Sequence, residues 1–240
     1  MAKSKTIPEP KASPAARRTR VGYVSPSVLG RIPAERVLDL LQHTGDRNAP
    51  IAWCGGGDLP HDLEAVCPIV VVNREDAIRM LDAESQTATI ELALGLSRRA
   101  KQAGAIRVVT GGGSRPIALV RESRGVWECL EADPVAVSHP RHLAGVGDVF
   151  AARLLSAALA ENPARLTAEL PLADALQLAR FAAAGYIADG VQPTTEEIEA
   201  AVAARPEYRP QGVHAVRSWS VPKPGGFVFN SLNWHPRPLV

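Results

Sequence analysis

The stretch 143-LAGVGDVFAARLLSAAL-159 says most about the fold of this chain. Two glycines, Gly145 and Gly147, precede an Ala- and Leu-rich run that has the length and composition of a buried helix. Because glycine has no side chain, an anion can approach its backbone closely, and the first turn of a helix offers unpaired N–H groups and the positive end of the helix dipole. The stretch therefore predicts an anion-binding turn followed by a helix over 148–160.

Asp148 stands in the first turn of this predicted helix. Its carboxylate can face the anion site and take a proton from a hydroxyl that attacks a phosphoryl group. The alternative is that the glycines only form a turn and that Asp148 only caps the helix. Segments further upstream bear on this choice.

Two upstream segments place polar residues or glycines directly after predicted strands. Asn73 follows the apolar run 68–72, and Asp76 lies in the helix predicted over 75–81. Three glycines, 111–113, follow the strand predicted over 106–110. Ligands of open α/β sheets bind outside the carboxyl ends of the strands, so the three loops together predict a nucleotide cleft.

The remaining chain alternates short apolar runs with amphipathic segments, which is typical of a layered α/β fold with a mostly parallel sheet. Strands are predicted over 21–25, 50–53, 68–72, 106–110, 117–120 and 126–130, the last two as a hairpin at a sheet edge, and helices over 33–42, 75–81, 88–101, 148–160, 172–188 and 195–204. We expect residues 1–20 to be a disordered basic arm, 21–205 an α/β domain, and 206–240 an extended C-terminal arm.

Composition excludes several classes of protein. The chain has 240 residues, of which 46% are hydrophobic, enough for one well-buried domain. Its charge is +2, but residues 1–20 hold Lys3, Lys5, Lys11, Arg17, Arg18 and Arg20 against Glu9 alone, so the body is mildly acidic and whole-protein binding to nucleic acid is not expected. Three cysteines without a C-x-x-C pair predict neither a disulfide framework nor a zinc site. Without an apolar leader or a membrane-spanning run, we expect a soluble, cytoplasmic protein.

These motifs resemble those of the ribokinase-like superfamily, which includes the PfkB carbohydrate kinases and the pyridoxal kinases. Its N-x-x-E helix start resembles residues 73–76, its V-T-x-G strand end resembles 109–112, and its G-x-G-D anion hole resembles 145–148. The resemblance continues through the Ala-rich segment 178–188 and the P-T-x-E-E-I segment 193–198, and it covers about residues 21–205. It implies a ribokinase-like layered α/β/α sheet.

The resemblance also implies a function, that of an ATP-dependent phosphotransferase acting on a sugar or hydroxymethyl hydroxyl. Asp148 would be the general base, and the amides of Gly145 to Gly147 would stabilise the phosphoryl charge, with Mg²⁺ bridging the phosphates. The other residues that the resemblance implicates are Asn73 and Asp76, which would act on the metal and phosphates through water, and Thr110, Gly112 and Val146, which would line the nucleotide site.

Some positions depart from the family pattern. The D-T-T of sugar kinases is replaced by His142, Leu143 and Ala144, which favours the pyridoxal-kinase branch, and Pro116 stands where a second glycine is common. Asp76 replaces a glutamate and is one methylene shorter. The family's N-terminal half, with most substrate contacts and the lid, has no counterpart before Val21, so the chain resembles the nucleotide-binding half of a kinase, truncated at its N-terminal side.

Several alternatives stay open. A second hypothesis is a non-catalytic scaffold or regulatory subunit of the same fold, which binds a protein partner or a second copy of itself. His139 and His142 could touch phosphate, or could be ordinary surface residues of a loop. The glycine loop at 53–58 could shape the cleft, or could be a plain turn. The acceptor could be a carbohydrate, a nucleoside or a pyridoxal-like compound.

Overall fold

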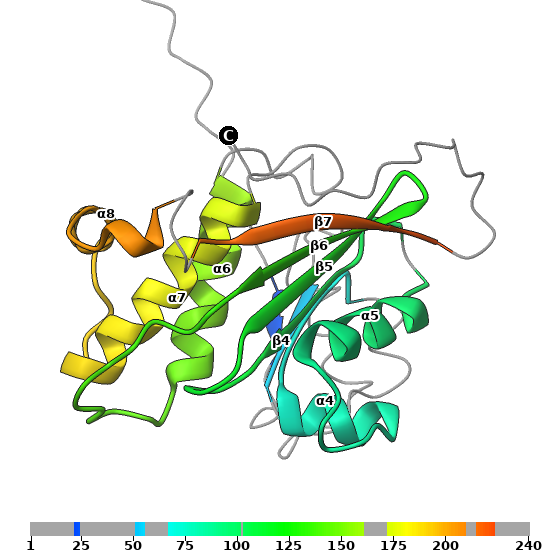
Figure 1. Cartoon of the computed structure of the whole chain (residues 1–240), viewed down its shortest axis with the longest axis horizontal. Helices are drawn as coiled ribbons and strands as arrows, with labels where there is room; N and C mark the ends of the chain where they lie inside the picture. Colours follow the sequence, from blue (N-terminus) through cyan, green and yellow to red (C-terminus); the bar gives the residue numbers. More distant parts are fainter. Residues whose placement is uncertain are drawn as a thin grey trace, which may run out of the picture.

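A computed structural model describes residues 22–24, 51–55, 67–101, 103–160, 172–209 and 215–223 of the chain. In this part of the chain a single seven-stranded sheet runs through the molecule, and its strands follow one another in the order of the sequence (Figure 1). The strands are β1 (Gly22–Val24), β2 (Ile51–Cys54), β3 (Ile69–Asn73), β4 (Ile106–Thr110), β5 (Ile117–Ser123), β6 (Val126–Ala132) and β7 (Arg217–Pro222).

The sheet is mixed, with a parallel half and an antiparallel half. Strands β1 to β4 pair in parallel, whereas β4 to β7 pair in antiparallel fashion. The expectation of a mostly parallel sheet is therefore correct for the first half only. The physical reason is the short turn over 111–116, because a connection of a few residues can join only antiparallel neighbours.

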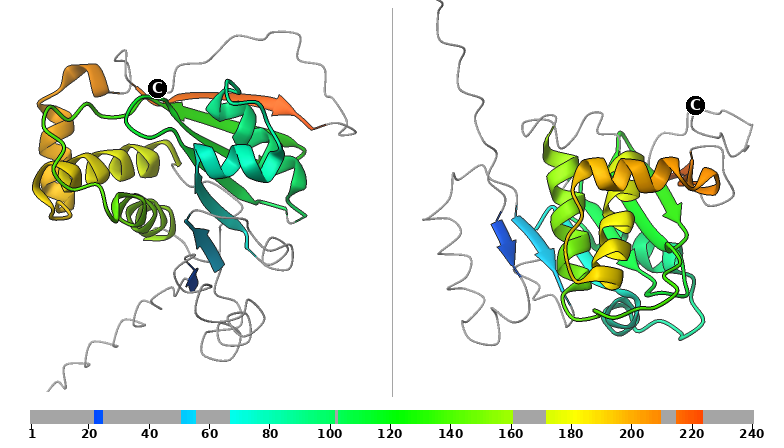
Figure 2. Two further views of the ribbon diagram at one scale, coloured as in Figure 1. Left: turned by 90° about the horizontal axis from the view of Figure 1, so that it is seen from below. Right: turned by 90° about the vertical axis from the view of Figure 1, so that its left-hand side faces the viewer.

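Helices cover both faces of the sheet, so the molecule has three layers (Figure 2). Helices α4 (Arg74–Leu81) and α5 (Thr89–Arg99) pack on one face, and α6 (Val146–Ala160) and α7 (Leu172–Asp189) pack on the other. Helix α8 (Thr195–Ala203) and the short 3₁₀ helix η2 (Pro206–Tyr208) pack against α7. No helix in these described residues is long and apolar enough to cross a membrane.

Strand β3 shows how the two cores are built from one sequence. Its residues alternate, so that Ile69 and Val71 join the core under α6 and α7, while Val70 and Val72 join the core under α4 and α5. All four are buried, as expected for a strand covered on both faces. The continuous β-branched run in the sequence is thus explained by burial on both sides.

The predicted elements inside the described residues are confirmed, with ends that differ by a few residues. The hairpin of β5 and β6 is longer than expected and is not at the edge, because β7 pairs with β6. Strand β7 lies within the predicted C-terminal arm, and its Trp219 and Val221 pack against the core under α4 and α5. The helix predicted over 33–42 and the arm over 1–20 lie outside the described residues.

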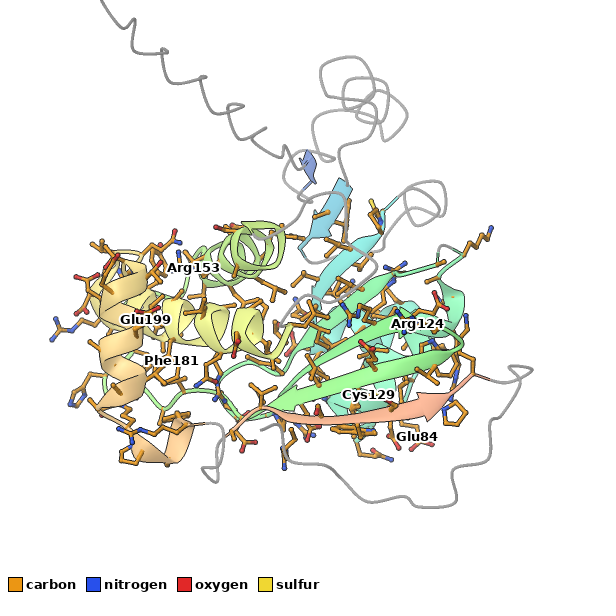
Figure 3. The ribbon with its side chains drawn as sticks, turned by 90° about the horizontal axis from the view of Figure 1, so that it is seen from above. Glu84, Arg124, Cys129, Arg153, Phe181 and Glu199 are labelled. Carbon is orange, nitrogen blue, oxygen red and sulfur yellow. The ribbon has the colours of Figure 1, made fainter. Side chains whose placement is uncertain are left out.

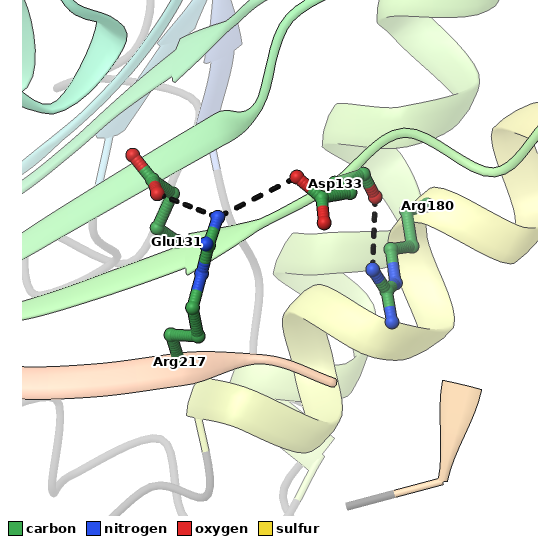
Figure 4. Close-up of polar contacts among 4 residues, drawn as sticks. All are labelled: Glu131, Asp133, Arg180 and Arg217. Atoms are coloured by element: carbon green, nitrogen blue, oxygen red, sulfur yellow. Dashed lines mark hydrogen bonds and ion pairs between the residues drawn. The ribbon is translucent and has the colours of Figure 1, made fainter. Parts of the chain in front are cut away.

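The end of β6 is tied to both β7 and α7 by two arginines (Figure 4). Arg217 on β7 donates to Glu131 at 2.7 Å and to Asp133 at 3.4 Å. Arg180 on α7, which is buried, donates to the backbone carbonyl of Asp133 at 2.8 Å, and burial lowers the pKa of its guanidinium to about 10. These contacts fix the position of α7 relative to the sheet.

Candidate functional site

The carboxyl ends of β2, β3 and β4 meet at one edge of the sheet. Asn73, the last residue of β3, is the register partner of Thr110, the last residue of β4. Cys54, the last residue of β2, pairs with Val71 of β3. The prediction that the loops after these strands lie side by side is therefore confirmed for the β3 and β4 loops.

Asn73 caps helix α4 and holds Asp76. The Asn73 Oδ1 accepts from the backbone N–H of Asp76 at 2.8 Å, and the Asn73 Nδ2 donates to Asp76 Oδ2 at 2.6 Å. Asp76 is only 3% exposed and also forms an ion pair with Arg79, whose side chain is largely exposed. The Asp76 carboxylate is thus already engaged within α4, while Asn73 is exposed at the sheet edge. Its contact with a metal through water stays a prediction.

The turn after β4 contains Gly111, which is closely surrounded by backbone atoms, and Gly112, whose backbone is open. The Thr110 hydroxyl lies 3.5 Å from the carbonyl oxygen of Val72. A Cβ at Gly111 would collide with the carbonyl oxygen of Arg115, so this position requires glycine. Gly112 has a φ of 68°, and in the part of the chain that the structure describes no atom lies within 4 Å of where its Cβ would be, so its backbone is open to a ligand.

We refer to residues 143–147 as the glycine turn. Gly145 has a φ of 82°, and its carbonyl accepts from the N–H of Val149 at 3.0 Å, in the first turn of α6. Val146 packs against the core under α6 and α7. Gly147 and Asp148 are exposed, and a Cβ at Gly147 would meet no atom of the described residues within 4 Å. The first turn of α6 therefore faces open space, as an anion site requires.

The electrostatics of Cys54 locate the glycine turn relative to the sheet. Burial raises the pKa of the Cys54 thiol to about 12, and the negative charge of Asp148 is the second cause of this rise. Helix α6 also packs against β2, which agrees with a position of Asp148 near the carboxyl end of that strand. The exposed acid of α6 and the ends of β3 and β4 thus share one edge of the sheet.

The C-terminal part of α7 supports the glycine turn and the two residues before it. The backbone N–H groups of Arg141 and His142 both donate to the carbonyl oxygen of Ile187, at 2.9 and 3.1 Å. The Tyr186 hydroxyl donates to the carbonyl oxygen of Ala144 at 3.0 Å. A Cβ at Gly190 would lie 2.8 Å from the His142 ring, so this close packing depends on glycine.

The sequence predicts Cys54 only as part of the glycine loop at 53–58, which could shape the cleft, and it does not predict Tyr186. Cys54 ends β2, so the rule that ligands gather at strand ends points to it. Tyr186 carries no such signal, because it reaches Ala144 across 42 positions of sequence. His142 is exposed and lies against Tyr186, with 6.3 Å between the ring centroids.

The side chains present suit a nucleotide better than a metal ion held by protein alone. Among the described residues, no group of three His, Cys, Asp or Glu side chains is placed to hold a metal ion. Mg²⁺ is commonly bound through one or two carboxylates together with substrate phosphates, so this donor set fits a metal brought by a nucleotide. The open backbones of Gly112 and Gly147 fit the phosphates.

Comparison with protein-family models finds no match, and comparison with curated proteins finds none either. Solved structures do match. Ribokinase from Giardia lamblia superposes with a TM-score of 0.57 at 14% identity, over 75% of this chain and 59% of that chain. Fructokinase from Vibrio cholerae O395, in a form bound to fructose, ADP and calcium, gives 0.56 at 14% identity, over 78% of this chain and 62% of that one.

A third structure, Arabidopsis thaliana ribokinase complexed with ribose and ATP, gives a TM-score of 0.58 at 15% identity, over 75% of this chain and 55% of that chain. The chain therefore spans less than two thirds of the length of these three kinases. The three-layer arrangement and these superpositions together show that the chain has the ribokinase-like fold.

Proposed function

We propose that this protein is an ATP-dependent small-molecule kinase that transfers the γ-phosphoryl group to a sugar or hydroxymethyl hydroxyl. The observation that carries the proposal is the exposed Asp148 beside Gly147 in the first turn of α6, since α6 packs against β2 at the edge where β2, β3 and β4 end. The solved kinases of the same fold, which include ribokinase and fructokinase, support this class of reaction.

Asp148 would act as the general base of the transfer. It accepts the proton of the acceptor hydroxyl while that oxygen forms a bond to the γ-phosphorus, and the bond from the phosphorus to the bridging oxygen breaks with its electron pair leaving on ADP. The backbone N–H groups of Gly145 to Gly147 would donate to the phosphoryl oxygens, where negative charge is concentrated in the transition state. Gly145 and Gly147 are exposed at the start of α6, which supports this role.

The nucleotide would lie along the neighbouring strand ends. Thr110, Gly112 and Val146 would line it, and Asn73 would hold a water molecule on the Mg²⁺ side. Asp76 would act through Asn73. Its carboxylate accepts a hydrogen bond from the side-chain amide of Asn73 and would thereby fix the orientation of that amide. ATP supplies the phosphoryl group when it is bound, and Mg²⁺ supplies charge that offsets the phosphates.

The second candidate is a non-catalytic scaffold or regulatory subunit that binds a protein partner. It is favoured by one observation, that the chain spans only 59% of the Giardia lamblia ribokinase and 62% of the Vibrio cholerae fructokinase. A partner or a second copy could complete the substrate site. The kinase proposal includes the acceptor, which would be a sugar, a nucleoside or a pyridoxal-like compound. It also includes a location in the cytoplasm.

Calorimetric titration of the full chain with ATP, with and without Mg²⁺, separates the two candidates. We expect saturable binding that Mg²⁺ strengthens. Gly147→Leu should abolish it, because a side chain would then fill the open space at the first turn of α6. Ala152→Leu, an exposed position one turn further along α6, is the matched control and should bind normally. Absence of binding at millimolar ATP would favour the scaffold.

A further inference from the structure

We propose that the chain has a second small-molecule site, apart from the glycine turn, that binds a small organic anion: a carboxylate or phosphate on an apolar body. The site is a pocket of about 400 Å³ between the segment 135–141 and helices α7 and α8. This volume lies within the range of ordinary ligand pockets. The inference does not depend on the kinase proposal.

The inner wall of this α7–α8 pocket is apolar and well supported. Phe181 and Ala184 of α7 and Ile198 of α8 line it, and all three are buried. The Phe181 ring meets the ring of Tyr208 edge to face, with 5.1 Å between centroids, which fixes its orientation. A flat or branched apolar group could therefore rest on a preformed surface.

The pocket lies on the face of α7 that is turned away from the sheet. Phe181, Ala184 and Ala188, spaced three and four residues apart, line the pocket, whereas Ala179 and Ala183 belong to the core beneath the sheet. Helix α7 thus stands between this pocket and the sheet. A ligand here would occupy a different place from a nucleotide at the strand ends.

Three basic side chains border the pocket: His139, Arg141 and Arg205. In the part of the chain that the structure describes, none of the three side chains has a hydrogen bond or an ion pair. Other arginines do find partners, as Arg121 does with Glu128 and Arg217 does with Glu131. The two guanidinium groups at the pocket therefore keep all their donors for a ligand, and their planar donor pairs match carboxylate and phosphate oxygens.

Two acids also line the pocket, and their charges offset those of the two arginines. The carboxylate of Glu197 accepts from the backbone N–H of Thr194 at 2.7 Å, and so belongs to the N-terminal cap of α8. Asp189 is exposed at the end of α7. Glu197 keeps its negative charge in this cap, so the lining has no net positive charge; the guanidinium donors of Arg141 and Arg205, which are unpaired among the described residues, are what favours an anion.

The test is calorimetric titration of the full chain with three probes that share one ring: phenyl phosphate, benzoate and benzyl alcohol. We expect saturable binding of at least one anion, and the preferred one identifies the charged group. The neutral benzyl alcohol should bind at least about tenfold more weakly. Equal binding of the alcohol, or no saturable binding of either anion, would overturn the proposal.

Substitutions in the α7–α8 pocket test whether the anion binds there. Arg141→Gln and Arg205→Gln, both at exposed positions, should each weaken the favoured anion by about five- to tenfold. Ala201→Leu, which narrows the pocket, should weaken it further. The matched control is Arg124→Gln, since Arg124 is an exposed arginine at the turn of the β5–β6 hairpin, at the opposite end of the molecule from Phe181 (Figure 3).

Gly147→Leu keeps this proposal distinct from the kinase proposal. It should leave binding of the favoured anion unchanged while it abolishes binding of ATP. If binding of the anion is lost in Gly147→Leu but normal in Arg141→Gln and Arg205→Gln, the anion sits at the glycine turn and the second site is refuted.

Discussion

Helices α4 and α6 both begin near the same edge of the sheet with an aspartate in the first turn, yet the two acids differ in exposure to solvent. Asp76 of α4 is 3% exposed and is bound by Asn73 and Arg79. Asp148 of α6 is exposed, beside glycines with open space around them. An acid in a first helical turn therefore says little by itself, because one such acid can be buried while another is exposed to solvent.

The sharpest test of this contrast is Asp148→Asn. If Asp148 is the base, the rate of phosphoryl transfer should fall by about 10²- to 10⁴-fold, because an amide cannot accept the proton. ATP affinity and the free energy of unfolding should stay close to wild type. A coupled assay of ADP release and urea denaturation measure the two effects.

Asp174→Asn is the matched control, since Asp174 is an exposed acid in the first turn of α7. It should keep full turnover. Normal turnover in Asp148→Asn itself would remove Asp148 from the base role and would make the two helix starts equivalent.

Asp76→Ala tests the other side of the contrast. It removes the acceptor of Asn73 Nδ2 and the partner of Arg79 from a buried position, so the free energy of unfolding should fall by about 2 kcal/mol. Urea denaturation gives the value. Glu75→Ala, at the exposed neighbouring acid, should change stability by less than about 0.5 kcal/mol. Equal losses in the two variants would mean that the buried contacts of Asp76 contribute no stability.

Tyr186→Phe tests whether the position of Asp148 depends on α7. The variant loses the hydrogen bond to Ala144, worth about 0.5–1.5 kcal/mol, and should lower kcat about two- to tenfold with little change in KM for ATP. Steady-state kinetics measure kcat and the KM for ATP separately. Tyr208→Phe removes a hydroxyl on the far side of α7 and should leave kcat unchanged; an equal fall in both variants would indicate a general loss of stability.

The smallest expected effect concerns Cys54. Its pKa of about 12 in the folded protein exceeds the unfolded value, so the stability that this difference contributes is present below about pH 9 and is lost as pH rises toward 12. Since Asp148 is the second cause, Asp148→Asn should lower the pKa of Cys54 and speed its alkylation above pH 9 by less than about tenfold. Asp76→Asn should not, and equal alkylation rates in all three proteins would separate Asp148 from Cys54.

Local sequence patterns predicted the elements well, because apolar periodicity and glycine turns act over a few residues. The apolar run 68–72 predicted β3, and Asn73 after it marked the position where α4 begins. The burial of Asp76 was not foreseen, since it depends on Arg79 and on the packing of α4. Strand β7 was missed because only Trp219 and Val221 mark its buried side, and pairing with β6 is not a local property.

The candidate site was predictable as far as strand ends and glycines go. The rule that parallel strands end at a common edge placed Asn73 beside Thr110 correctly. The support from Tyr186 and the carbonyl of Ile187 could not be predicted, since it joins α7 to the glycine turn across more than 40 residues. The mixed sheet follows from the short 111–116 turn, because a turn of this length makes β5 antiparallel to β4.

Strand β3 is buried and apolar on both faces, and this has a consequence for folding. If β3 paired with β4 one residue out of register, Ile69 and Val71 would exchange faces with Val70 and Val72, and no charged residue of β3 would become buried. Hydrophobicity alone therefore does not select the native pairing. Asn73 is the polar residue that ends the run and caps α4, so the same side chain that borders the candidate site also sets where the strand must stop.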